Sequence, residues 1–166
     1  MRPGRPSQPR LTRDALLAEA LSLLDTGEHA LTIRALALRL KVTPMAVQHH
    51  IGSRDALIRD LADHVYAAVT ATEPDALGSL LQSYAAAVRA HPHLTLALFR
   101  TSGPLPREAQ RITDTLETLL LAHTARLPMA RIWRDILIDW AHGMALAQSP
   151  QDHAPALEAL LQAART

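Results

Sequence analysis

Hydrogen-bonding side chains cluster on one short segment in the first third of the chain. Gln48, His49 and His50 follow one another directly, and the small residue Ala46 lies just before Val47. The Gln48 amide can donate to and accept from a single adenine edge, and a histidine ring can donate to phosphate or to a guanine edge. Ala46 permits close approach or contact with a thymine methyl group. The chemistry available here is recognition of bases and phosphates.

Two short helices joined by a three-residue turn must position these side chains. The first is predicted to begin at Thr32 and to last about nine residues, and the turn is Lys41-Val42-Thr43. The second begins at Pro44, because proline after a capping threonine is typical of a helix start, and it ends before Gly52. Val47 and Ile51 lie one turn apart and would face the core. The side chains left on the outer face are Met45, Ala46, Gln48, His49 and His50.

Longer helices are predicted on both sides of this pair. Apolar residues recur with helical spacing from Leu16 to Leu24, after the capping residue Thr12, and again from Leu57 to Val69, after Ser53. The whole pattern is that of a helix-turn-helix, in which the second helix of the pair enters the major groove of DNA. Thr32, Thr43 and Arg54 stand at helix starts, where backbone N–H groups and these side chains can hold phosphates.

Catalysis and metal binding are disfavoured by the residues present. The chain has no cysteine, Lys41 is its only lysine, and the common nucleophile, zinc and phosphate-loop motifs do not occur. Two histidine pairs, His49-His50 and His91 with His93, lack a spacing typical of metal ligands. We therefore predict no catalytic residues, no metal site and no cofactor.

The composition favours an all-α protein. Alanine (30) and leucine (29) supply much of the 166 residues, whereas aromatic residues make up 3%. Prolines divide the second half into helical segments near 75–90, 93–101, 106–126, 128–148 and 152–164, so we expect eight or nine helices. No apolar run suits a membrane span or a secretory signal, and the absence of cysteine fits a reducing compartment. We expect a cytoplasmic protein that does not bind membranes.

The first eleven residues form a basic arm. Arg2, Arg5, Arg10 and Arg13 all precede the first acidic residue, and Pro3, Pro6 and Pro9 favour an extended chain. Gly4-Arg5-Pro6 resembles the core of an AT-hook, whose arginine lies in a narrow minor groove. Arg2 and Arg5 are thus candidate DNA contacts, and a solubilising tail is the alternative interpretation.

Residues 12–65 resemble the amino-terminal domain of TetR-type (TetR/AcrR) transcriptional regulators. The resemblance rests on the stretches Leu31–Ala37, Leu40–Val47 and His50–Leu57, with the helix before them. Two residues depart from the pattern, because Lys41 stands where the family usually has glycine and Gln48 where it usually has tyrosine. The resemblance implies an N-terminal three-helix domain over 12–65, and a C-terminal helical bundle over 66–166 that dimerises and holds a small-molecule inducer.

The resemblance also implies roles for individual residues. Arg34 and the exposed face of the 44–50 helix would read the bases of a palindromic operator, while Thr32, His50 and Arg54 would anchor phosphates. An inducer pocket would be lined by side chains from the second half of the chain, with the candidates Tyr84, His91, Phe99, Arg100 and Trp140. The alternative for these residues is ordinary bundle core and surface.

A wide apolar stripe over 129–144 is a candidate dimer interface. Together with the last helix it could form a four-helix bundle between two subunits, with the candidate residues Ile132, Trp133, Ile136, Leu157, Leu160 and Leu161. An ordinary buried helix is the alternative. A dimer is favoured because one recognition helix contacts too few bases to be specific, whereas two copies about 34–36 Å apart read successive major grooves.

These observations predict a ligand-responsive DNA-binding regulator. We expect a repressor that binds a double-stranded DNA operator as a homodimer and is released by an inducer that the sequence leaves unidentified. The alternative is a helical carrier or enzyme with an incidental helix-turn-helix. DNA affinity that falls steeply with salt would distinguish the two hypotheses.

Overall fold

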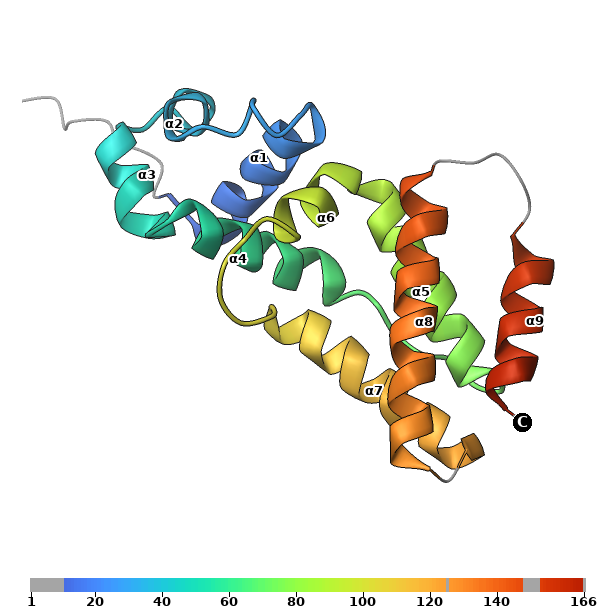
Figure 1. Cartoon of the computed structure of the whole chain (residues 1–166). Helices are drawn as coiled ribbons and strands as arrows, with labels where there is room; N and C mark the ends of the chain where they lie inside the picture. Colours follow the sequence, from blue (N-terminus) through green and yellow to red (C-terminus); the bar gives the residue numbers. More distant parts are fainter. Residues whose placement is uncertain (1–10, 125, 148–152, 166) are drawn as a thin grey trace, which may run out of the picture.

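The computed structural model describes residues 11–124, 126–147 and 153–165, and all its regular elements in these ranges are α-helices (Figure 1). The predicted all-α class is confirmed, and the nine described helices agree with the expected eight or nine. None of the described helices is both long and apolar enough to cross a membrane. The helices are α1 (Arg13–Asp25), α2 (Ile33–Leu40), α3 (Pro44–Ile51), α4 (Arg54–Tyr66), α5 (Ala76–Ala90), α6 (Pro92–Leu98), α7 (Arg107–Thr124), α8 (Leu127–Leu146) and α9 (Ala154–Ala164).

Side-chain caps fix where the first four helices begin. Thr12, Thr32, Thr43 and Ser53 have extended backbones, and each hydroxyl oxygen accepts a hydrogen bond of 3.1 to 3.2 Å from the backbone N–H three residues later. Such a cap satisfies an N–H group that has no partner within the helix and stabilises by about 1 kcal/mol. The four caps predicted from sequence are confirmed.

The buried side chains form two hydrophobic cores that meet along α4. The first core holds α1, α2, α3 and the first half of α4, where Leu57, Ile58 and Leu61 are buried. The second core holds the end of α4, with Ala62 and Tyr66, and helices α5, α7, α8 and α9. Figure 1 shows α4 running from the α1–α3 end of the molecule toward the larger bundle. Helix α4 is therefore the element that both halves share.

Helix α6 joins the first core although it comes late in the sequence. Its Leu94 and Ala97 are fully buried among α1–α4 side chains, while Val65 and Leu98 pack against both cores. Helices α4 and α6 lie side by side in Figure 1. The helix-turn-helix half predicted over 12–65 therefore packs against a helix from the second half.

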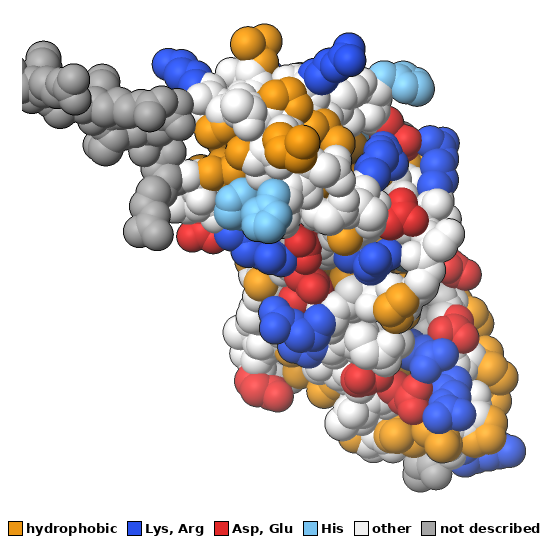
Figure 2. Space-filling model, turned by 90° about the vertical axis from the view of Figure 1, so that its left-hand side faces the viewer, with side chains coloured by type: hydrophobic (Ala, Val, Ile, Leu, Met, Phe, Trp, Pro, Cys, Tyr) orange, Lys and Arg blue, Asp and Glu red, His pale blue; other side chains and the backbone are white. Residues whose placement is uncertain are grey.

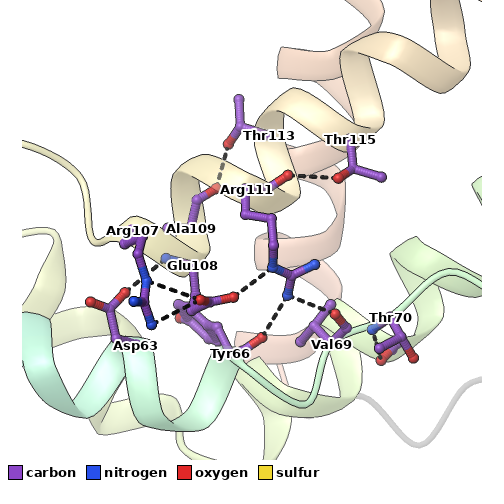
Figure 3. Close-up of polar contacts among 11 residues, drawn as sticks. Asp63, Tyr66, Val69, Thr70, Arg107, Glu108, Ala109, Arg111, Thr113 and Thr115 are labelled. Atoms are coloured by element: carbon purple, nitrogen blue, oxygen red, sulfur yellow. Dashed lines mark hydrogen bonds and ion pairs between the residues drawn. The ribbon is translucent and has the colours of Figure 1, made fainter.

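Polar contacts join the end of α4 to the start of α7 (Figure 3). Asp63 accepts a hydrogen bond of 2.8 Å from the backbone N–H of Glu108, and Arg111 donates to the carbonyls of Tyr66 (3.2 Å) and Val69 (2.8 Å). Glu108 in turn pairs with Arg111. Asp63 thus caps the start of α7, because the first N–H groups of that helix need acceptors.

The turn between α2 and α3 requires an unusual backbone at Lys41. Its φ is 54°, in the left-handed region, and the Val42 N–H donates to the Ala37 carbonyl at 3.0 Å to close the end of α2. Glycine adopts this conformation freely, whereas a residue with a Cβ is strained by about 1 kcal/mol. Lys41 is the position at which the resemblance in sequence expects glycine, and the left-handed backbone gives the physical reason for that preference.

We expect Lys41→Gly to be more stable than Lys41→Ala by about 1 kcal/mol, because both remove the amine but only glycine relieves the left-handed strain. Urea unfolding of the two variants measures the difference. The comparison with alanine serves as the control for loss of the side chain. Equal midpoints in urea would contradict a left-handed backbone at this turn.

Candidate nucleic-acid interface and internal pocket

The helix-turn-helix presents its predicted contact residues outward. Val47 and Ile51 of α3 are buried against the first core, as predicted. Ala46 is half-buried, and the remaining candidates of the helix pair and the start of α4 are exposed: Thr32, Arg34, Thr43, Pro44, Met45, Gln48, His49, His50 and Arg54. Arg2 and Arg5 lie outside the described residues. The structure thus brings together, at one end of the molecule, all the candidates that it describes.

This end of the molecule has an excess of positive charge. The sequence from Leu31 to Arg54 contains no aspartate or glutamate. Arg39 pairs with Glu19 and donates to Ser22 on α1, but the exposed side chains of Arg34, Lys41 and Arg54 have no hydrogen-bond or ion-pair partner among the described residues. Three cations without an ion-pair partner among the described residues suit a polyanion such as a DNA backbone.

Exposed apolar side chains also lie on this charged surface. Leu38 is 79% exposed and Met45 is 78% exposed, which is more than any other large hydrophobic side chain in the described ranges. Figure 2 shows hydrophobic side chains at this end of the molecule, flanked by Lys and Arg side chains. Apolar contact with thymine methyl groups is one use for such side chains in a DNA reader. Leu38 lies one helical turn after Arg34 and is not among the contacts predicted from sequence.

Gln48 already has one partner on its own helix. Its side-chain nitrogen donates to the Gly52 carbonyl at 2.5 Å, at the end of α3. Its side-chain oxygen and second N–H have no partner among the residues that the structure describes, so the amide can still accept from and donate to a base edge. The neighbouring rings of His49 and His50 meet edge to face, with centroids 6.0 Å apart.

A cavity of about 570 Å³ opens in the second half of the molecule. Helices α4 to α8 contribute to its wall, and so does the loop between α6 and α7. Two of the predicted pocket residues, Tyr84 and Phe99, line it. The lining residues that the sequence analysis did not single out include Tyr66, Thr95, Thr113, Arg134 and His142.

The three other pocket candidates lie outside this cavity. His91 bonds to Asp25 at 3.0 Å, and Arg100 pairs with Glu28 at 2.7 Å. Both contacts tie the two ends of α6 to α1 and to the loop that follows it. Trp140 lines a smaller cavity of about 280 Å³ between α5, α8 and α9. The rotation of each helix about its axis decides which cavity or surface a side chain faces. Residue spacing in the sequence does not define that rotation closely enough.

Two hydrogen-bonded pairs of neutral side chains contribute to the polar lining of the 570 Å³ cavity. The Tyr84 hydroxyl and His142 Nε2 are 2.6 Å apart, and the hydroxyls of Tyr66 and Thr95 are 3.2 Å apart. Burial raises the pKa of both tyrosines, and Tyr66 further raises the pKa of Tyr84. Burial lowers the pKa of His142, although Asp139 acts in the opposite direction. These groups are therefore uncharged at neutral pH.

The candidate interface residues of α8 and α9 divide into two sets. Ile132 and Ile136 are 52% and 41% exposed, and Trp133 and Leu160 are half-buried. Leu157 and Leu161 instead lie inside the core of the same subunit. These two side chains pack against α5, α7 and α8 of the same chain, so Leu157 and Leu161 do not belong to a surface open to a second copy.

The fold and this charged surface define a helix-turn-helix protein with a helical second domain. Within the described ranges, no group of three or more histidine or acidic side chains is arranged to hold a metal ion. No protein-family model and no curated protein sequence matches the chain.

Solved structures share this architecture over nearly the whole chain, which has the fold of TetR-family transcriptional regulators. BioQ bound to its double-stranded DNA operator matches with a TM-score of 0.78 and 21% identity, over 94% of this chain and 99% of that chain. A TetR regulator from Streptomyces coelicolor matches with a TM-score of 0.69 and 26% identity, over 93% and 88%. ActR from Streptomyces coelicolor, in complex with actinorhodin, matches with a TM-score of 0.72 and 24% identity, over 94% and 86%.

We expect His142 to make stability depend on pH below neutrality. Its pKa is lowered in the folded chain, so the unfolded chain takes up a proton first as the pH falls below about 6.5. This contribution to stability is present above that pH and is lost as the pH falls toward the folded pKa. Thermal unfolding between pH 7.5 and 5.5 should therefore show a smaller loss of stability for His142→Gln than for the parent chain. Identical pH slopes would contradict the assignment.

Proposed function

We propose that this protein is a ligand-responsive transcriptional regulator, a repressor that binds a palindromic DNA operator as a homodimer. The observation that carries the proposal is the acid-free surface of α2 and α3, with Arg34, Lys41 and Arg54 unpartnered among the described residues and α3 exposing Gln48 and its two neighbouring histidines. The likeness to BioQ, which was solved with its DNA operator, supports the same function.

The exposed apolar face of α8 supports the homodimer. Met129, Ile132 and Ile136 are each between 37% and 52% exposed, and their spacing places them on one face of α8 over about two turns. Exposing such a stripe to water is unfavourable, and a twofold partner presenting the same stripe would cover it. Half-buried Trp133 and Leu160 would form the border of this interface.

Regulation would pass from the cavity to the helix-turn-helix through α4. Tyr66 of α4 lines the cavity, and so do residues of the loop between α6 and α7. That loop is bonded to α4 at Ser102, whose N–H donates to Asp55 at 3.2 Å and whose carbonyl accepts from Arg59 at 2.7 Å. A ligand that displaces the loop or Tyr66 therefore acts on α4, which shares a core with α3.

A shift of α4 would change the separation of the two recognition helices in a dimer. Operator affinity and ligand affinity would then be reciprocally coupled. The protein would act in the cytoplasm as a DNA-binding switch and not as an enzyme. The regulators with the same fold that were solved with small molecules, such as ActR with actinorhodin, support a ligand for this cavity.

We expect a protection footprint on the DNA upstream of its own gene to show a twofold-symmetric site. On that site, Arg54→Ala should make the plot of log affinity against log salt less steep by roughly two, because each subunit loses one phosphate contact and each contact contributes about −0.9. Filter binding or fluorescence anisotropy across a salt series measures the slope.

Arg89→Ala is the matched control for this experiment. Arg89 is also an exposed arginine, but it lies on α5 in the second half of the molecule, so its loss should leave the slope unchanged. An unchanged slope for Arg54→Ala, or an equal effect of both variants, would refute the proposed phosphate contact. Absence of any specific site in a genome-wide selection of bound fragments would refute the regulator itself.

We expect Ile136→Glu to convert the dimer into a monomer, because a carboxylate without a partner is costly to bury in an apolar interface. Sedimentation equilibrium gives the mass, and circular dichroism confirms that the helices remain. Leu96→Glu, at an apolar site of comparable exposure on α6, should stay dimeric. A dimer that persists in Ile136→Glu at micromolar concentration would exclude this face as the interface.

A further inference from the structure

The charges at the large cavity disfavour an anionic ligand. Arg134 is the only lysine or arginine among the described residues that line the cavity, and its guanidinium already contacts two carboxylates, Glu117 at 2.5 Å and Asp135 at 2.8 Å. Glu117 also pairs with Arg131 at 3.4 Å, so two guanidiniums face two carboxylates and this group has no net charge. An anionic ligand would therefore meet no unpaired cation among the described residues that line the cavity, and burying its charge there would be costly.

Large aromatic and apolar side chains are exposed at the cavity. Phe99 and Leu105 line it and are each 59% exposed, which is unusual for side chains of this size. The Phe99 ring meets the His142 ring edge to face at 5.0 Å, and His142 meets Tyr84 in the same way at 5.4 Å. These rings present edges and faces against which another flat ring can pack.

Two threonine hydroxyls that line the cavity already donate their hydrogen to the backbone. The Thr113 hydroxyl donates to the Ala109 carbonyl, and the Thr101 hydroxyl donates to the Leu98 carbonyl, both at 2.8 Å (Figure 3 shows the first). Each hydroxyl hydrogen is therefore already used, and each oxygen keeps lone pairs that can accept. A ligand group that meets these oxygens must be a donor.

We propose that the cavity binds an uncharged aromatic compound that carries hydroxyl donors, with a donor directed at Thr113. A volume of about 570 Å³ is within the range of sites for drug-sized ligands, so a compound of two or three fused rings fits. This inference rests on the proposed function, because it names the chemical class of the ligand to which the regulator would respond.

Three probes with one ring system test the chemical class: a dihydroxynaphthalene, its dimethyl ether and the corresponding naphthalene carboxylate. Isothermal titration of the full chain should give the tightest binding for the diol, by about tenfold over the carboxylate and about threefold to tenfold over the ether. Binding of the carboxylate or the ether as tight as that of the diol would overturn the proposal, and so would failure of the diol to bind.

A pair of variants on α7 tests the position. Thr113→Val keeps the shape of the side chain and removes its oxygen, so it should weaken the diol about threefold to tenfold and leave the ether unchanged. Thr118→Val is the matched control, because Thr118 also donates to a carbonyl of its own helix, that of Asp114, but lies outside this cavity. Equal effects of the two variants on the diol would place the ligand elsewhere.

Repeating the titrations in the presence of operator DNA separates this inference from the proposed function. If the diol binds at Thr113 but leaves operator affinity unchanged, the ligand class stands and ligand-responsive regulation is refuted. If only the carboxylate releases the operator, regulation stands and the ligand class is refuted.

Discussion

The burial of α4 in two hydrophobic cores is the constraint on which the rest of the structure depends. Leu57, Ile58 and Leu61 are buried on the side of the helix-turn-helix, and Ala62 and Tyr66 are buried in the larger bundle. Because closely packed interiors resist small displacements, α4 moves with whatever surrounds it at either end. The same helix therefore holds α3 in place and forms part of the cavity wall.

Polar contacts complement this packing by fixing α4 along its length. Asp55 and Arg59 bind the loop after α6, and Asp63 caps α7. Arg111 satisfies carbonyls at and just beyond the end of α4, and its hydrogen bond holds the pKa of Glu108 below the ordinary value. These bonds cross between helices that are far apart in sequence, so they link the cavity wall to α4 by direct contact. A protein with this arrangement is suited to couple ligand binding to the position of α3.

The local features of the DNA-reading half could be predicted because they depend on neighbours in sequence. Capping by Thr32, Thr43 and Ser53 requires only an N–H three residues later, and the strain at Lys41 follows from a three-residue turn. The i,i+4 spacing of Val47 and Ile51 likewise determined which face of α3 points outward. The helices of the second half were predicted equally well, because prolines mark their ends.

Only the tertiary structure decided which distant residues meet. His142 and Thr113 line the cavity while His91 and Arg100 bind the first helix and its loop, and no local pattern distinguishes these cases. Leu157 and Leu161 are buried while Ile132 and Ile136 are exposed, although all four fit an apolar helix face. The sequence by itself determined the helices, their caps and the outward face of α3, since these depend on contacts within a few residues. The cavity, the α4–α7 junction and the open face of α8 depend on how helices rotate and pack, which is a property of the whole chain.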